Sequence, residues 1–134
     1  MDLLDNLVEY LAKQLNMVPG EDAFYHEMPD EPDTCFCLYE VKTTLDSPPQ
    51  IDAISRRVRF ATRANGNSAS NALAEQMWLA LWHDAERDID VPDGFITLRD
   101  GIVFVDLRGK PIWDKSDQRN RKYFCFEAVI TTTK

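Results

Sequence analysis

The apolar positions near the start of the chain recur at helical spacing. Five leucine and valine side chains lie three or four residues apart, which predicts one apolar face on a helix over residues 2–16. These side chains are Leu4, Leu7, Val8, Leu11 and Leu15. Pro19 and Gly20 are predicted to end the element, because proline cannot continue a helix.

A second apolar helix is predicted to begin at Ser68 or Ser70, because either hydroxyl can accept the free amide hydrogens of a first turn. We expect it to continue to about Asp88. Its core stripe consists of Leu73, Met77, Ala80 and Leu81. Trp78 and Trp82 lie four residues apart on a neighbouring stripe, so the apolar face is wide. We therefore expect this helix to contact more than one surface.

Alternating and β-branched or aromatic runs predict the strands. The predicted strands cover residues 23–25, 34–41, 56–63, 95–99, 102–107 and 123–132. The strands at 34–41 and 123–132 are apolar on both faces, which favours central positions. Asp100-Gly101 predicts a two-residue turn between the fourth and fifth strands. Residues 28–33, 43–53 and 115–122 are predicted to be loops.

The strand at 56–63 shows a half-buried pattern. Val58, Phe60 and Thr62 point to one side of it. Arg57, Arg59 and Arg63 point to the other, which predicts a basic outer face.

The order of elements is helix, strands, helix, strands, which differs from the strict alternation of doubly wound folds. It predicts an α+β fold, with one mostly antiparallel mixed sheet and two helices packed on one face. A length of 134 residues fits a single domain over residues 1–134.

The net charge narrows the classes of partner. It is −8, with 15 Lys and Arg against 23 Asp and Glu, so a sequence-independent grip on phosphate backbones is not expected. The apolar runs are short of the ~20 residues that a spanning helix needs, so we expect no membrane association. The acidic N-terminus lacks the pattern of a secretory signal, and we expect a soluble protein that stays where it is made.

The side chains suited to catalysis or metal binding form no recognisable motif. Cys35, Cys37 and Cys125 are predicted to be free thiols in the core, with Cys35 and Cys37 aligned with Cys125 on adjacent strands. His26 and His83 have no local partner arrangement typical of a general base. We therefore expect no enzymatic activity, no metal and no cofactor.

Arginine and tryptophan provide the candidates for an interface. Arginines of the strand at 56–63 are expected to pair with acidic groups of this chain or of a partner, and tryptophan is enriched at interfaces. The candidate interface residues are Arg57, Arg59, Arg63, Trp78, Trp82, Trp113, Arg119 and Arg121. Acid concentrates at residues 27–33 and 84–93 and base at 56–63 and 119–122. Such separated patches suit head-to-tail contact between copies.

The order of segments along nearly the whole chain resembles the tail terminator proteins of long-tailed bacteriophages, often labelled minor capsid proteins. The segments that carry the resemblance are the leucine-rich helix at 3–15, Met28-Pro29-Asp30-Glu31-Pro32, Cys35-Phe36-Cys37-Leu38-Tyr39, Arg57-Val58-Arg59-Phe60-Ala61-Thr62-Arg63, the alanine-rich helix at 69–81, Gly109-Lys110-Pro111-Ile112-Trp113-Asp114 and Arg121-Lys122-Tyr123-Phe124-Cys125-Phe126-Glu127.

The resemblance implies an α+β virion protein without catalytic residues. Such subunits form a ring, usually a hexamer, that caps the tail tube at its head-proximal end and stops polymerisation. The implied partners are further copies of the chain, the tail tube protein and a head connector or head-completion protein, while DNA passes without being specifically bound. Assembly is expected in the host cytoplasm.

Two other interpretations remain open from the residues. The chain could be a cytoplasmic binding module that holds a small anionic ligand or a peptide on the sheet, with arginines of the strand at 56–63 as clamps. A small enzyme that uses His26 or His83 is the third.

Overall fold

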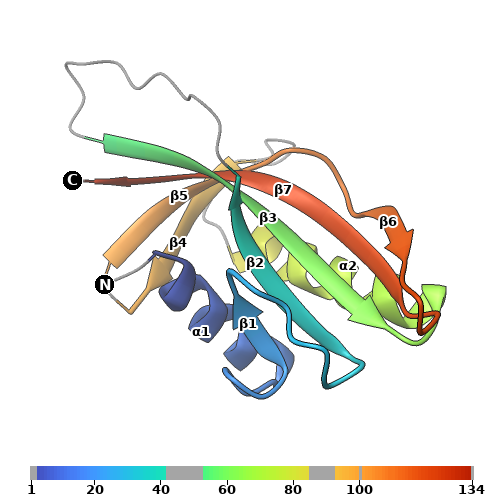
Figure 1. Ribbon diagram of the computed structural model, residues 1–134. Helices are drawn as coiled ribbons and strands as arrows, with labels where there is room; N and C mark the ends of the chain where they lie inside the picture. The colour runs from blue at the N-terminus through green and yellow to red at the C-terminus, as the bar shows by residue number, and fades with distance from the viewer. Residues whose placement is uncertain (1–2, 42–52, 85–92, 100, 134) are drawn as a thin grey trace.

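The computed structural model describes residues 3–41, 53–84, 93–99 and 101–133. Two helices and seven strands follow one another along the chain (Figure 1). They are α1 (Leu3–Leu15), β1 (Ala23–Tyr25), β2 (Cys35–Val41), β3 (Ala53–Ala64), α2 (Asn67–Asp84), β4 (Asp93–Leu98), β5 (Gly101–Leu107), β6 (Ile112–Ser116) and β7 (Lys122–Thr133). The predicted α+β class is confirmed.

All seven strands belong to one curled sheet with the order β1-β2-β3-β7-β5-β4, and β6 pairs with β7 (Figure 1). β1 is parallel to β2, and the other pairs are antiparallel. The sheet is therefore mixed and mostly antiparallel, as the sequence predicts.

β7 pairs with three other strands of the sheet, β3, β5 and β6. One of its edges pairs with β3 along its full length, from Ala64 opposite Lys122 to Ala53 opposite Thr133. β5 and β6 must therefore share the other edge, where they lie end to end: Leu107 is opposite Ala128 and Ile112 is opposite Cys125. Gly109, with φ of 99°, lies in the short connection between them. A left-handed backbone is costly for other residues, which explains a glycine at this position.

Both helices and the sheet contribute to a single core. Leu4, Leu7 and Leu11 of α1 are buried in the same cluster as Met77 and Leu81 of α2. The strands add buried side chains that include Phe36, Leu38, Val58, Phe60, Phe126 and Ile130. The rings of Phe60 and Phe126 stack with centroids 4.7 Å apart. Each fully buried leucine or phenylalanine contributes about 2 kcal/mol, so this cluster is the main stabilising element.

The start of α2 differs from the prediction. The helix begins at Asn67, so Ser68 and Ser70 both lie inside its first turn and neither precedes it as a cap. The amide of Ser70 donates to the carbonyl of Gly66 at 3.0 Å. The hydroxyl of Ser70 is buried and lies 3.0 Å from Thr62 Oγ1, so it joins the helix to β3. Residues 85–88, over which the helix was expected to continue, lie outside the described residues.

The C-terminal half contains one strand that the sequence did not indicate. Ile112–Ser116 is β6, so the predicted loop at 115–122 is reduced to a short turn between β6 and β7. The predicted hairpin is present, but its pairing opens at Leu98 opposite Gly101, which makes Gly101 a strand residue with φ of 144°. Of the predicted loop at 43–53, residues 43–52 lie outside the described residues.

Candidate interaction site

The outer face of β3 carries arginines that are paired with acidic groups of the same chain. Arg59 Nη2 lies 3.2 Å from Glu127 Oε2, and Arg57 Nε lies 3.7 Å from Glu127 Oε1. Arg56 Nε lies 3.9 Å from Glu40. Glu127 is directly opposite Arg59 in the ladder, so register alone brings this pair together. The expectation that these arginines pair with acidic groups is confirmed for this chain.

Arg63 does not belong to this exposed row. Only 2% of the residue is exposed, although it shares a strand face with Arg59. Its guanidinium donates to the carbonyl oxygens of Pro29 at 2.8 Å, Pro32 at 2.6 Å and Asp33 at 3.3 Å. The predicted basic outer face is therefore wrong at this end of β3, because the 28–33 loop covers it. The loop supplies carbonyl acceptors, and the fork of guanidinium donors fits them.

Arg121 is the second buried arginine, with 4% of the residue exposed. Its Nε donates to Asp117 Oδ2 at 2.8 Å, and its Nη2 to Asp30 Oδ1 at 3.0 Å. Burial alone disfavours the charged form, but these hydrogen bonds outweigh it and hold the pKa of Arg121 above its usual value. The side chain thus ties the turn before β7 to the 28–33 loop.

Asp117 organises the turn between β6 and β7. Its carboxylate accepts from the amides of Arg119 and Arg121, each at 3.0 Å, and from the Tyr123 hydroxyl at 3.0 Å. Burial alone would raise the pKa of Asp117, but the hydrogen bonds from Arg121 and Tyr123 lower it to about 2. The carboxylate therefore stays charged under any physiological condition.

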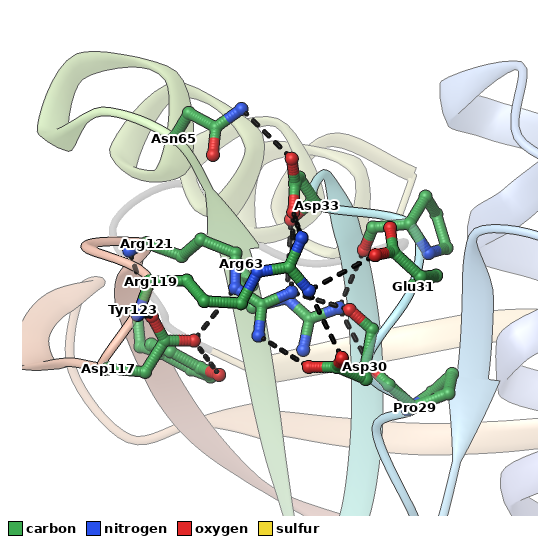
Figure 2. Close-up of polar contacts among 11 residues, drawn as sticks. Pro29, Asp30, Glu31, Asp33, Arg63, Asn65, Asp117, Arg119, Arg121 and Tyr123 are labelled. Atoms are coloured by element: carbon green, nitrogen blue, oxygen red, sulfur yellow. Dashed lines mark hydrogen bonds and ion pairs between the residues drawn. The ribbon is translucent and has the colours of Figure 1, made fainter.

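Arg119 completes the network from its exposed side. It lies 3.1 Å from Asp30, 3.1 Å from Glu31 and 3.6 Å from Asp33. Figure 2 shows Arg63, Arg119 and Arg121 converging on the 28–33 loop from β3 and from the turn before β7. We call these three arginines with Asp30, Glu31, Asp33 and Asp117 the arginine clasp.

The clasp changes the picture of separated charge patches. The acidic segment around residues 27–33 and the basic segment at 119–122 largely neutralise each other within one chain, so they are not two patches that await another copy.

A cavity of about 370 Å³ lies beside the clasp, lined by Met28, Gln118 and Tyr123 among others. Three guanidinium groups, of Arg63, Arg119 and Arg121, and two carboxylates, of Asp30 and Asp117, line it. Each of these arginines is already bonded to carboxylate or carbonyl oxygens of this chain, so an anionic ligand in the cavity would have to compete with them.

A second hollow, of about 350 Å³, lies on the outer face of the sheet. It is lined by Tyr39, Arg59, Asp114, Lys115 and Tyr123, among others. The Lys115 ammonium lies 5.0 Å from the centre of the Tyr123 ring. Both signs of charge and two phenol rings line this hollow, so it resembles protein contact surface more than a ligand pocket.

The three cysteines are free thiols that lie in strands of the sheet. Cys37 and Cys125 both lie opposite Ala61, so they are aligned across the sheet but with β3 between them, and the prediction of adjacent strands is wrong. Burial raises the pKa of the Cys37 thiol to about 11 and also raises the pKa values of Cys35 and Cys125. Neutral thiols are poor nucleophiles. Within the described residues, no group of three or more His, Cys, Asp or Glu is placed to hold a metal ion.

The tryptophans do not form one patch. Trp78 is half-buried, packs against the core and donates from Nε1 to the carbonyl of Gly109 at 3.0 Å. Trp113 lies on β6 and is 54% exposed. Trp82 is in α2, and its side chain lies outside the described residues. Ile112, which is 64% exposed on β6, is a surface residue that sequence reasoning missed. The only sequence signal there is that β-branched Ile112 and aromatic Trp113 stand side by side between Pro111 and a polar run.

Comparison with known proteins identifies the family. The family model described as bacteriophage tail terminator protein matches residues 10–133. No curated protein matches the chain. Neither described helix is long and apolar enough to cross a membrane. The family is one of phage structural proteins, and membership makes this chain a component of the virion tail. By a match that covers nearly its full length, the chain belongs to the bacteriophage tail terminator family.

Proposed function

We propose that copies of this protein form a ring, with six subunits as in similar proteins, at the head-proximal end of the tail tube. The ring stops tube polymerisation and presents a surface for head–tail joining. The observation that carries the proposal is the family match over residues 10–133. The role needs no chemistry, and it agrees with a site whose charged groups are occupied by internal ion pairs.

The subunit surface for this role is the outer face and the open margins of the sheet. We infer that both helices pack against the same face, because α1 and α2 share one buried cluster with Phe36, Phe60 and Phe126. The opposite face, with Arg57 and Arg59, is then left for contacts with other subunits.

The interface that we propose keeps some of the expected residues and loses others. Arg57, Arg59 and Trp113 remain, since their side chains reach the surface. Arg63 and Arg121 are buried and serve the subunit itself. Arg119 is exposed but engaged in the clasp, and Trp78 is half-buried against the core.

The partners that we propose are further copies of the chain, the tail tube protein and a head connector or head-completion protein. DNA passes the ring without specific contacts. A net charge of −8 supports this, and so do arginines that are neutralised by carboxylates. Assembly takes place in the host cytoplasm, and the finished ring stays in the virion.

The test is a phage that lacks this protein, complemented by the wild-type gene as the control. Electron microscopy should show tail tubes of uncontrolled length and few joined heads without the protein, and fixed lengths with it. Tails of normal length joined to heads in its absence would contradict the proposal. A monomer in isolated solution would not, because the tube can template the ring.

A further inference from the structure

β6 is an open edge of the sheet. Among the described residues it pairs only with β7, and all five of its residues are exposed. Ile112 lies opposite Cys125 and Trp113 opposite Phe124, so their side chains point to opposite faces of the sheet. An exposed edge with apolar side chains is a template for a strand from another chain.

β1 is the opposite edge at the same level of the sheet. The segment before it bridges its outer side at Ala23, which pairs with Pro19 and accepts from the amide of Gly20 at 2.9 Å, so another strand can reach β1 at its far end, towards Tyr25. One row of paired residues crosses the whole section, from Phe24 through Cys37, Ala61 and Cys125 to Ile112. Figure 1 shows β1 and β6 on opposite margins of this section. Since β1 is parallel to β2 and each later neighbour reverses direction, β6 is antiparallel to β1.

This geometry fits a closed ring. A rotation about an axis along the strands brings β6 of one copy to β1 of the next without reversing either strand. The two strands then meet in antiparallel orientation, and the row that ends at Ile112 continues at Phe24 of the next copy. Two different edges of the same chain meet, which is the heterologous contact that a ring requires.

The charges of the two edges are complementary. Residues 14–41 contain seven Asp and Glu and no Lys or Arg, whereas residues 108–122 contain six Lys and Arg and two Asp. The clasp occupies Asp30, Glu31, Asp33, Arg119 and Arg121 of these. Glu40 pairs with Arg56 and Arg108 with Asp106, so the complementarity depends on the remaining charges. Beside β1, Glu21 and Glu27 are exposed and form no ion pair with the described residues; Lys110, beside β6, also forms none. Lys115 adds a second exposed positive charge on β6 itself.

We propose that β6 of one copy lies antiparallel beside β1 of the next copy, and that this contact builds the ring. The inference rests on the proposed ring function and names its surface. Antiparallel order places Lys110, before β6, near Glu27, after β1. It places Lys115, late in β6, near Asp22, before β1. In this contact the next copy covers Ile112 on one face of the sheet and Trp113 on the other. The exposed Val18, which precedes β1 of that copy, lies close to them.

Paired cysteines on one chain test the contact and its direction. A chain with Lys110→Cys and Glu27→Cys, mildly oxidised at high concentration and on purified tails, should give a ladder of disulfide-linked multimers up to the ring. The matched control is Lys110→Cys with Glu21→Cys, which uses an exposed glutamate at the other end of β1. We expect at least tenfold less product from it. The wild-type chain controls for its own three cysteines.

Several results would overturn the inference. A stronger ladder from the control pair means parallel order, and a dimer from Lys110→Cys alone means that β6 contacts β6. Tails that contain the doubly substituted protein, keep their fixed length and give no ladder contradict this contact while the proposed function stands. A ladder combined with normal tails in the absence of the protein contradicts the function instead.

A charge exchange gives an independent readout. Lys110→Glu should reduce assembly at least tenfold by placing like charges together, and adding Glu27→Lys should restore it. Lys13→Glu, at an exposed position on α1, is the control and should assemble normally. All these positions are exposed, so the thermal midpoint should not change. A double variant that remains as defective as Lys110→Glu would contradict the pairing.

Discussion

Arg59 and Arg63 lie four residues apart on the same face of β3, yet they are in different environments. The side chain of Arg59 is 47% exposed and paired with Glu127 on the neighbouring strand. Arg63 is buried under the 28–33 loop and donates to three backbone carbonyls. The difference comes from what lies above the strand, since the ladder and the strand face are the same. The comparison predicts that one arginine stabilises the subunit and the other is available for contacts.

The largest expected effect is at Arg63. Arg63→Met keeps the approximate length but leaves the carbonyls of Pro29, Pro32 and Asp33 without their donor. We expect a loss of about 3 kcal/mol in the free energy of unfolding, measured by urea denaturation. Arg63→Lys should recover less than half of it, because a single ammonium cannot match the fork. If Arg63→Met lowered the free energy of unfolding by less than about 1 kcal/mol, Arg63 would contribute no more than an exposed ion pair such as that of Arg59.

Asp117 tests the clasp through pH. Its pKa is lowered to about 2 in the folded protein, below its ordinary value near 3.8, so the charged carboxylate stabilises the fold above pH 4. That contribution is lost as the pH falls from about 4 towards 2. The thermal midpoint of Asp117→Asn should lie below that of the wild type at pH 6, by less than for Arg63→Met, and the gap should close by pH 2. A gap that is independent of pH would contradict the assignment.

Thr62 tests the effect of burial with an uncharged group, on the face of β3 that points to the core. Its hydroxyl lies 3.0 Å from both the carbonyl and the hydroxyl of Ser70 and is buried. Thr62→Val removes the hydroxyl and should cost about 1 kcal/mol. Thermal unfolding measures it, and Thr131→Val, at a half-buried hydroxyl pair with Ser55, should cost less. Equal losses would show that burial does not set the cost here.

The smallest effect on stability is expected at Arg59. Arg59→Ala removes an exposed ion pair and should change the free energy of unfolding by less than about 1 kcal/mol. The same variant should reduce ring assembly if the outer face takes part in contacts. A loss of stability as large as that of Arg63→Met would mean that the two arginines do not differ as described.

Local patterns were enough for most of the fold. The spacing of Leu4, Leu7 and Leu11 located α1, alternation located β3, and a run that is apolar on both faces located β7, each within a few residues. Two features depended on contacts distant in sequence. The burial of Arg63 is caused by a loop 30 residues earlier, and β6 is a strand because β7 offers it an edge. Polar residues Asp114, Lys115 and Ser116 gave it no strand signal of their own.

The position of β6 has a consequence for the rate of assembly. Trp78 Nε1 donates a hydrogen bond to the carbonyl of Gly109, just before β6. At the end of β6, Lys122 Nζ donates to Ser116 Oγ at 2.8 Å. The backbone entropy of this edge is therefore lost when the subunit folds, before any partner arrives. A strand that docks there meets an ordered template, so association is limited by encounter and orientation and needs no coupled folding step.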